Sequence, residues 1–146
     1  MRSRRGTLRG THKGLLILIV DDNTDTAELL VRLLRRGGLA ALHVVCAHDA
    51  LEYLRGDDGP TTPLPSLVIL DIAMPGMDGI ECLRTIRAEP KWAGVPVIMY
   101  TADFALERLH EALRLGAAGY VVKGVMGWDE LLALIHQHRR AAPVGA

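Results

Sequence analysis

Short apolar runs alternate with longer amphipathic stretches through most of the 146-residue chain. The runs are almost continuously apolar, which is typical of strands that are covered on both faces within a parallel sheet. Five such runs predict strands at Leu15–Val20, Leu39–Cys46, Leu67–Leu70, Val95–Tyr100 and Gly119–Val122.

The stretches between the runs repeat apolar residues at helical spacing. In the first stretch the apolar positions follow i, i+3, i+4 and i+7 from Ala27 to Leu34, with Asn23 as the N-cap and Gly37 and Gly38 as the stop. Similar spacing predicts four more helices, around Ala47–Leu54, Ile80–Ile86, Asp103–Leu115 and from Leu131 to about Arg140.

Strand and helix alternate five times with short connections, which predicts an α/β fold with helices on both faces of an open sheet. We expect the flavodoxin-like (βα)5 arrangement, a doubly wound five-stranded parallel sheet in the order 2-1-3-4-5, because right-handed crossovers leave few alternatives. The predicted domain spans residues 14–140. Residues 1–13 form a basic tail that we expect to be disordered, and residues 141–146 form a short C-terminal tail.

Charge is unevenly distributed, although the formal net charge is zero. Five of the 17 basic residues lie in the first 13 positions, which contain no acid. The remainder therefore has 12 basic and 17 acidic residues, a net charge of −5, which does not favour a nucleic-acid partner. The apolar run at 15–20 is too short to span a membrane and lacks the features of a secretory signal, so we expect no membrane partner.

The two cysteines, Cys46 and Cys82, lie in different predicted elements and form no metal-binding motif. We interpret both as small buried side chains in a reducing compartment, and we therefore expect the protein to be cytoplasmic.

Polar residues directly follow four of the five apolar runs. Asp21 and Asp22 follow the first run and Asp71 follows the third, whereas Thr101 and Lys123 follow the fourth and fifth. Because the carboxyl ends of parallel strands meet at one edge of a sheet, where ligands bind in such folds, we expect these side chains to converge.

Taken one at a time, these residues have ordinary structural explanations. An aspartate or threonine after a strand is often a helix cap, and a lone lysine is usually solvated. Taken together they favour a reactive site, because neighbouring carboxylates repel one another and raise one another's pKa values unless a cation lies among them. Hard oxygen ligands of this kind are the set that Mg²⁺ prefers, with Mn²⁺ as an alternative.

Asp71 is the best candidate for a nucleophile, because the third strand is central in the predicted order. A carboxylate can attack a phosphoryl group to form an aspartyl phosphate, and Thr101 would then hydrogen-bond the new phosphoryl oxygen. The tight turn at Pro75 and Gly76 would bring backbone carbonyls, among them that of Ala73, toward the metal.

Four segments carry a family resemblance: ILIVDDN (17–23), LVILDIAMPGMDGIECLRTIR (67–87), VPVIMYTA (95–102) and GAAGYVVK (116–123). In this order they resemble the receiver domain of two-component response regulators, over about residues 14–138. The resemblance implies Mg²⁺-dependent phosphotransfer to Asp71 from a histidine kinase or a phosphotransfer protein. It implies a signalling phosphoacceptor and not an enzyme, one that at most promotes its own phosphorylation and dephosphorylation.

The resemblance also implies roles for single residues. Asp21 and Asp22 match the acidic pair, of which Asp22 is the direct metal ligand. Thr101 matches the switch hydroxyl, Tyr120 the rotating aromatic and Lys123 the invariant lysine. Phosphorylation would draw Thr101 inward and let Tyr120 follow, which would shift the face of helix 4, strand 5 and helix 5 toward its partner-binding state.

The sequence says less about the downstream partner and the assembly state. The downstream protein is unknown, and a homodimer through the same face is among the assemblies that the resemblance implies. Since little sequence follows residue 140, we expect a stand-alone receiver.

Two departures and three alternatives accompany this interpretation. Gly124 stands where the family usually has proline, so we expect a trans Lys123–Gly124 bond or a looser loop. The segment before the last helix is also about one residue longer than usual. A metal-dependent phosphatase with an aspartyl nucleophile would need a second acid where Ala73 stands. A nucleotide-binding protein would need a phosphate-binding loop in place of the acidic pair. A receiver-like scaffold that is not phosphorylated remains an alternative because of Gly124.

Overall fold

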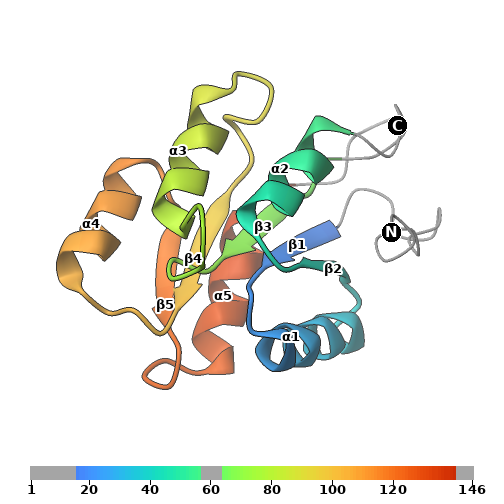
Figure 1. Cartoon of the computed structure of the whole chain (residues 1–146). Helices are drawn as coiled ribbons and strands as arrows, with labels where there is room; N and C mark the ends of the chain where they lie inside the picture. Colours follow the sequence, from blue (N-terminus) through green and yellow to red (C-terminus); the bar gives the residue numbers. More distant parts are fainter. Residues whose placement is uncertain (1–15, 57–63, 141–146) are drawn as a thin grey trace.

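The computed structural model describes residues 16–56 and 64–140, in which helices cover both faces of a five-stranded sheet (Figure 1). All strand pairs are parallel and follow the order β2-β1-β3-β4-β5, which confirms the predicted fold class. The predicted tails at 1–13 and 141–146, and Leu15, lie outside the described residues. The strands are β1 (Leu16–Val20), β2 (Ala40–Val44), β3 (Leu67–Leu70), β4 (Val97–Thr101) and β5 (Gly119–Val122).

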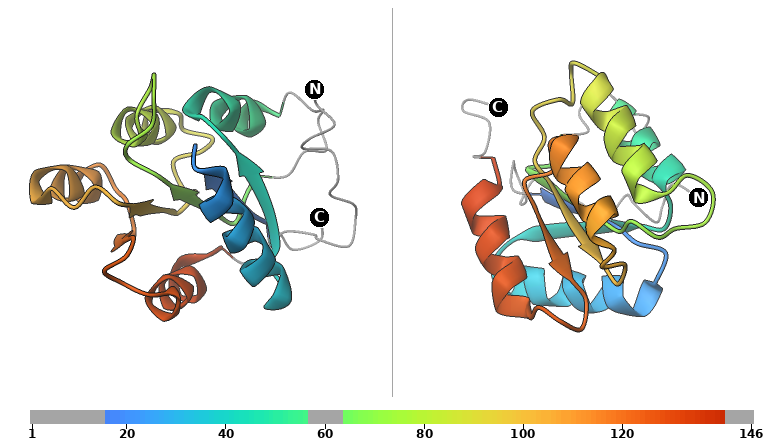
Figure 2. Two further views of the ribbon diagram at one scale, coloured as in Figure 1. Left: turned by 60° about the horizontal axis from the view of Figure 1, so that its bottom comes forward. Right: turned by 90° about the vertical axis from the view of Figure 1, so that its left-hand side faces the viewer.

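Helices α1 and α5 lie on one face of the sheet, and α2, α3 and α4 lie on the other (Figure 2). Their bounds are α1 (Thr24–Arg36), α2 (Ala47–Arg55), α3 (Gly79–Ala88), α4 (Leu106–Arg114) and α5 (Trp128–His138). Within the described ranges, no helix combines the length and apolar character needed to cross a bilayer.

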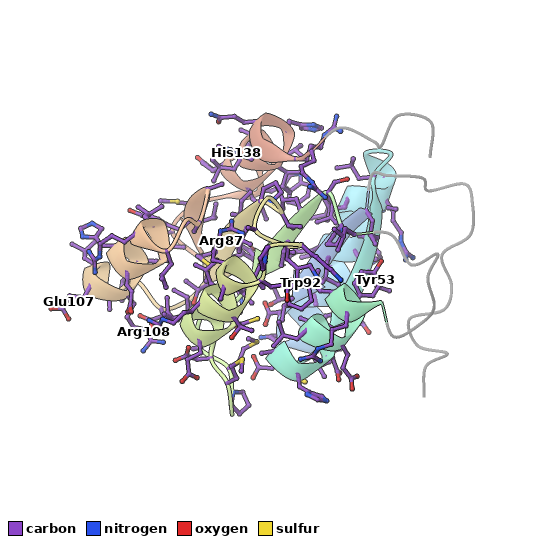
Figure 3. All side chains as sticks on the ribbon, turned by 90° about the horizontal axis from the view of Figure 1, so that it is seen from above. Tyr53, Arg87, Trp92, Glu107, Arg108 and His138 are labelled. Carbon is purple, nitrogen blue, oxygen red and sulfur yellow. The ribbon has the colours of Figure 1, made fainter. Side chains whose placement is uncertain are left out.

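Each face of the sheet has its own apolar core, because successive strand residues point to opposite sides. On β1, Ile17 and Ile19 pack toward α1 and α5, whereas Leu18 packs toward α2, α3 and α4. The large side chains of Tyr53 and Trp92 are buried in the core on the side of α2, α3 and α4 (Figure 3). Burial on both sides explains why the strand sequences are apolar throughout.

The first helix begins and ends as predicted. The Asn23 side chain accepts a hydrogen bond from the Thr26 N–H at 3.0 Å, and the Gly37 N–H donates to carbonyls of the last turn. Gly38 has a φ of +87°, a conformation that favours glycine. The acidic pair before Asn23 is therefore followed by a firmly capped helix.

Two strands differ from their predicted bounds. β2 ends at Val44, because Cys46 is the extended N-cap residue of α2. β4 begins two residues later than predicted, at Val97, after Pro96, which has no N–H to contribute to the sheet. Thr101 is accordingly the last residue of β4.

The last two helices also differ from the prediction. α4 begins at Leu106 and not at Asp103, because side-chain bonds compete with the helix. Asp103 Oδ1 accepts from the Ala105 N–H at 3.0 Å, and the Asp103 N–H donates to Thr101 Oγ1 at 3.0 Å. α5 ends at His138, two residues earlier than predicted.

Only one of the cysteines is fully buried. Cys82 is buried in α3, where burial and the charge of Asp78 raise the pKa of its thiol to about 12. Cys46 is half-buried, so its interpretation as a buried side chain was wrong. Both thiols are free.

Candidate functional site

Backbone hydrogen bonds bring the predicted site residues to one edge of the sheet. The Asp21 N–H donates to Val44 O at 3.1 Å, the Asp71 N–H to Val20 O at 3.0 Å and the Lys123 N–H to Thr101 O at 2.8 Å. Each bond lies just beyond the end of a strand. The backbones of Asp21, Asp71 and Lys123 are thereby fixed by the pairing of β1, β3 and β5 with their neighbours.

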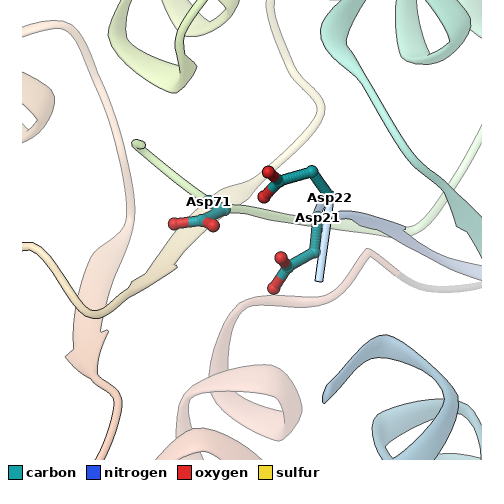
Figure 4. Close-up of side chains that lie close together, drawn as sticks. All are labelled: Asp21, Asp22 and Asp71. Atoms are coloured by element: carbon teal, nitrogen blue, oxygen red, sulfur yellow. The ribbon is translucent and has the colours of Figure 1, made fainter. Parts of the chain in front are cut away.

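Three carboxylates form a cluster at this edge (Figure 4). Asp21, Asp22 and Asp71 each offer an oxygen atom, and these atoms lie within 4.8 Å of one another. Asp21 and Asp71 are buried, whereas Asp22 is exposed. The cluster is therefore open to solvent on the side of Asp22 and enclosed around Asp71.

Lys123 supplies the positive charge of the site. Its Nζ atom lies 2.8 Å from Asp21 Oδ2 and 3.6 Å from Asp71 Oδ2. The same atom lies 5.4 Å from the centroid of the Tyr100 ring, within the range of a cation–π contact. Lys123 thus bridges two carboxylates in the described structure.

Burial and charge oppose each other at Asp71. Burial raises the pKa of this carboxyl above its usual 3.8, Lys123 lowers it and the charge of Asp21 raises it, which leaves the pKa raised. At Lys123, burial lowers the pKa of the ammonium group, but the hydrogen bond and charge of Asp21 and the charge of Asp71 outweigh burial, so the pKa is raised. Lys123 therefore stays protonated at neutral pH, next to a carboxylate that is costly to ionise.

The carboxylate cluster fits a divalent cation. Asp71 Oδ1 is buried and has no hydrogen-bond partner within the described part of the chain. Burying a carboxylate oxygen without a hydrogen-bond donor destabilises the folded state, and a metal ion bound to that oxygen would offset this cost. Oxygen donors alone, one of them exposed to water, are the ligands that Mg²⁺ prefers. The donor set thus supports the predicted metal site.

Thr101 and Tyr120 lie on β4 and β5, outside the carboxylate cluster. The Thr101 side chain is buried, and its hydroxyl lowers the pKa of Asp71 against the larger effect of burial. Tyr120 is half-buried on β5, where it pairs with Met99 of β4 and packs against the core beneath α2, α3 and α4. Both residues therefore occupy the two strands that connect the site to α4 and α5.

The loop after β3 folds back on Asp71. Gly76 has a φ of +76°, as the predicted turn requires. The Gly79 N–H donates to Ile72 O at 2.8 Å, and a Cβ at Gly79 would collide with the Asp71 carbonyl. Ala73 is exposed in this loop, and the role of its carbonyl stays a prediction.

The loop after Lys123 contains no proline and no cis bond. Lys123–Gly124 is trans, as predicted, and Gly124 has a φ of +80°. Lys123 pairs with Met126 in an isolated bridge. The atypical sequence therefore forms a local turn that leaves Lys123 in contact with the acids.

Two residues near the site were not predicted. His43 Nε2 lies 2.8 Å from the Asp21 carbonyl oxygen, and Arg108 forms ion pairs with Asp78 and Asp103. The position of His43 follows from the pairing of β1 with β2, because His43 precedes the strand end that lies next to Asp21. No sequence pattern indicated the partners of Arg108.

Comparison with known proteins identifies relatives over most of the chain. A family model of the response regulator receiver domain matches residues 17–136. The chain is 37% identical over 114 residues to the chemotaxis protein CheY of Pseudomonas aeruginosa, covering 73% of this chain and 82% of CheY. It is also 37% identical over 130 residues to an uncharacterized 14.6 kDa protein of Leptolyngbya boryana, covering 89% of this chain and 94% of that protein. The crystal structure of a response regulator receiver protein from Pseudomonas putida superposes with a TM-score of 0.75 at 29% identity, covering 84% and 95% of the two chains.

Proposed function

The chain belongs to the response regulator receiver domain family, and on this premise we propose that Asp71 accepts a phosphoryl group from a histidine kinase or a phosphotransfer protein. The position of Asp71 is the observation that carries the proposal. This carboxylate is buried at the end of the central strand β3, beside two other carboxylates and 3.6 Å from the Lys123 ammonium. We assign the protein to cytoplasmic signalling, as a phosphoacceptor.

The transfer step uses groups that already lie at the site. A carboxylate oxygen of Asp71 bonds to phosphorus while the P–N bond of a phosphohistidine breaks, and the departing imidazole keeps the bonding electrons and takes up a proton. In this proposal protonated Lys123 pairs with an oxygen of the phosphoryl group, and the Thr101 hydroxyl donates to another. Mg²⁺ or Mn²⁺, when bound by Asp21, Asp22, Asp71 and the Ala73 carbonyl, offsets negative charge on the transferring group.

Phosphorylation acts as a switch in this proposal. The phosphoryl group draws the Thr101 hydroxyl inward, and Tyr120 on the neighbouring strand follows. The face formed by α4, β5 and α5 then shifts toward a conformation that binds a downstream protein or a second copy of the chain. This is a population shift, because the phosphoryl group interacts more favourably with one of two conformations.

Intact-mass analysis after incubation with acetyl phosphate, with and without Mg²⁺, tests the proposal. We expect a Mg²⁺-dependent gain of one phosphoryl group in the native chain and none in Asp71→Asn. Asp49→Asn, at the start of α2 and away from the cluster, is the matched control and should be labelled like the native chain. Failure of the native chain to react, under conditions that label another receiver, would favour the non-phosphorylated scaffold.

A further inference from the structure

One arginine of α4 reaches two separate loops. Arg108 Nη2 lies 3.2 Å from Asp78 Oδ2, and its Nε lies 3.1 Å from Asp103 Oδ2. Asp78 is the N-cap residue of α3, whereas Asp103 lies two residues after Thr101. Figure 3 shows Arg108 on the side of α4 that faces α3, whereas Glu107 points away from the molecule. Arg108 therefore ties α4 both to the loop after β3 and to the loop after β4.

Asp103 connects this arginine to the Thr101 hydroxyl. The Asp103 N–H donates to Thr101 Oγ1 at 3.0 Å, while the carboxylate accepts from the Ala105 N–H and pairs with Arg108. Movement of the hydroxyl toward Asp71 lengthens the bond from Asp103 unless Asp103 moves as well. A shift of Asp103 therefore disturbs its ion pair with Arg108 or the ion pair of Arg108 with Asp78.

Few other contacts restrain this end of α4. Its N-cap residue, Ala105, provides no side-chain bond, and only Leu109 and Ala112 are buried along the helix. A second ion pair, Arg84–Glu111 at 2.8 Å, also joins α3 to α4 but contacts neither loop. Among the residues that the structure describes, the Arg108–Asp103 pair is thus the ionic link between α4 and the residues next to Thr101.

We infer that Arg108 is a positioning residue that holds α4 and the loop after β4 in the unphosphorylated arrangement, and that activation breaks its ion pairs. This inference rests on the proposed function, because it assumes that Thr101 moves toward a phosphoryl group on Asp71. An arginine suits this role, since its planar group presents several donors and can contact two carboxylates at once.

Binding of beryllium fluoride, a phosphoryl analogue, in the presence of Mg²⁺ tests the inference. We expect Arg108→Ala to lower the apparent Kd about two- to fivefold, because a partly exposed ion pair no longer opposes the binding-competent state. Arg84→Ala is the control: it removes an α3–α4 ion pair that is more exposed than the Arg108 pairs and contacts neither loop, so it should leave the Kd unchanged. Equal Kd values for the two variants would overturn the inference and leave the proposed function intact.

A second variant tests the path through Asp103. Asp103→Asn keeps a side-chain oxygen for the Ala105 N–H but removes the charge that faces Arg108. Asp103→Asn should also lower the Kd for beryllium fluoride. Adding Arg108→Ala to the Asp103→Asn variant should then change the Kd less than it does in the native chain. Full additivity of the two substitutions would show that Arg108 does not act through Asp103 and would overturn the inference.

Amide hydrogen exchange without any phosphoryl analogue separates this inference from the proposed function. The Asp103 amide should exchange faster in Arg108→Ala than in Arg84→Ala, because its bond to Thr101 opens more often. Equal exchange rates would overturn the inference even if Asp71 is phosphorylated. Absence of beryllium fluoride binding and of phosphorylation in the native chain would overturn both proposals.

Discussion

Helices α3 and α4 both follow strands that end at the acidic site, but they are held in different ways. Asp78 caps α3 by accepting from the Glu81 N–H at 2.9 Å, and Glu81 accepts from the Asp78 N–H at 3.2 Å. Half of the ten residues of α3 are buried. α4 has no side-chain cap, two of its nine residues are buried, and Leu106 is 62% exposed.

This difference separates a fixed part of the site from a movable part. The chain after Asp71 is held by close packing and by a complete cap, so the Asp71 carboxylate keeps its place. The chain after Thr101 is held mainly by polar contacts near the surface, which can exchange with water at low cost in free energy. The proposed function requires both properties: a fixed acceptor, and a segment that responds to it.

Truncating one leucine in each helix should produce the largest contrast. We expect Leu83→Ala in α3 to lower the free energy of unfolding by about 2–5 kcal/mol, because it leaves a cavity in the core. Leu113→Ala in α4, where the side chain is 40% exposed, should cost about 0.5 kcal/mol. Urea denaturation of both variants measures the difference, and similar losses would contradict the contrast between the helices.

A methyl group at the start of α3 should also destabilise the protein. In Gly79→Ala the new Cβ would meet the Asp71 carbonyl and lie 2.7 Å from the Ile72 Cα, so we expect a loss of about 1–3 kcal/mol. Gly94→Ala is the control, since a Cβ there meets only an Arg140 side-chain atom at 3.7 Å. If both substitutions were equally mild in thermal unfolding, the loop after β3 would not be rigidly packed.

Adding a cap to α4 should make it more like α3. Ala105 has the extended backbone of an N-cap residue, with φ −64° and ψ 117°, so Ala105→Ser should stabilise the protein by about 0.5–1 kcal/mol. Ala102→Ser places the same hydroxyl outside the cap position and should have no such effect. Guanidinium denaturation compares the two, and equal stabilities would show that the missing cap does not limit α4.

The smallest expected effect on stability is that of the Asp71 charge, and it depends on pH. It is small because Lys123 offsets part of the cost of burying this charge. The folded state raises the pKa of Asp71 above the unfolded value of 3.8, so ionised Asp71 destabilises the fold. This cost develops as the pH rises from 3.8 through the raised pKa and is absent below 3.8. Asp71→Asn should therefore increase the free energy of unfolding at pH 7 relative to the native chain.

The increase should disappear as the pH falls below 3.8, where Asp71 is protonated in both states. Asp103→Asn, on the α4 side, removes a carboxylate that is paired with Arg108 and should not stabilise the fold. A constant effect of Asp71→Asn at all pH values would contradict the electrostatic explanation.

The part of the site that depends on strand ends could be predicted from the sequence. Asp21, Asp71 and Lys123 converge because each follows a buried strand of a parallel sheet, and the hydrophobic pattern locates those strands. The start of α4 could not be located in this way, because the side chain of Asp103 competes with the helix for local hydrogen bonds.

Contacts between side chains on different elements also could not be predicted from the sequence. Arg108 pairs with an aspartate 30 positions away, and this choice depends on how α4 packs beside α3. In the folded chain the Lys123 Nζ lies closer to Asp21 than to Asp71, and no sequence pattern indicated this order. Side-chain rotamers and helix packing determine such pairings, and neither produces a periodic pattern in the sequence.

The bond between Lys123 and Asp21 joins residues that are 102 positions apart. During synthesis the acidic residues that follow β1 and β3 leave the ribosome well before Lys123, which supplies their counter-charge. Contacts this distant in sequence form late, because closing long loops costs entropy. A partly synthesised or truncated chain would thus contain Asp71 but lack the Lys123 ammonium group, so under the proposed function only a chain that has completed its fold would accept a phosphoryl group.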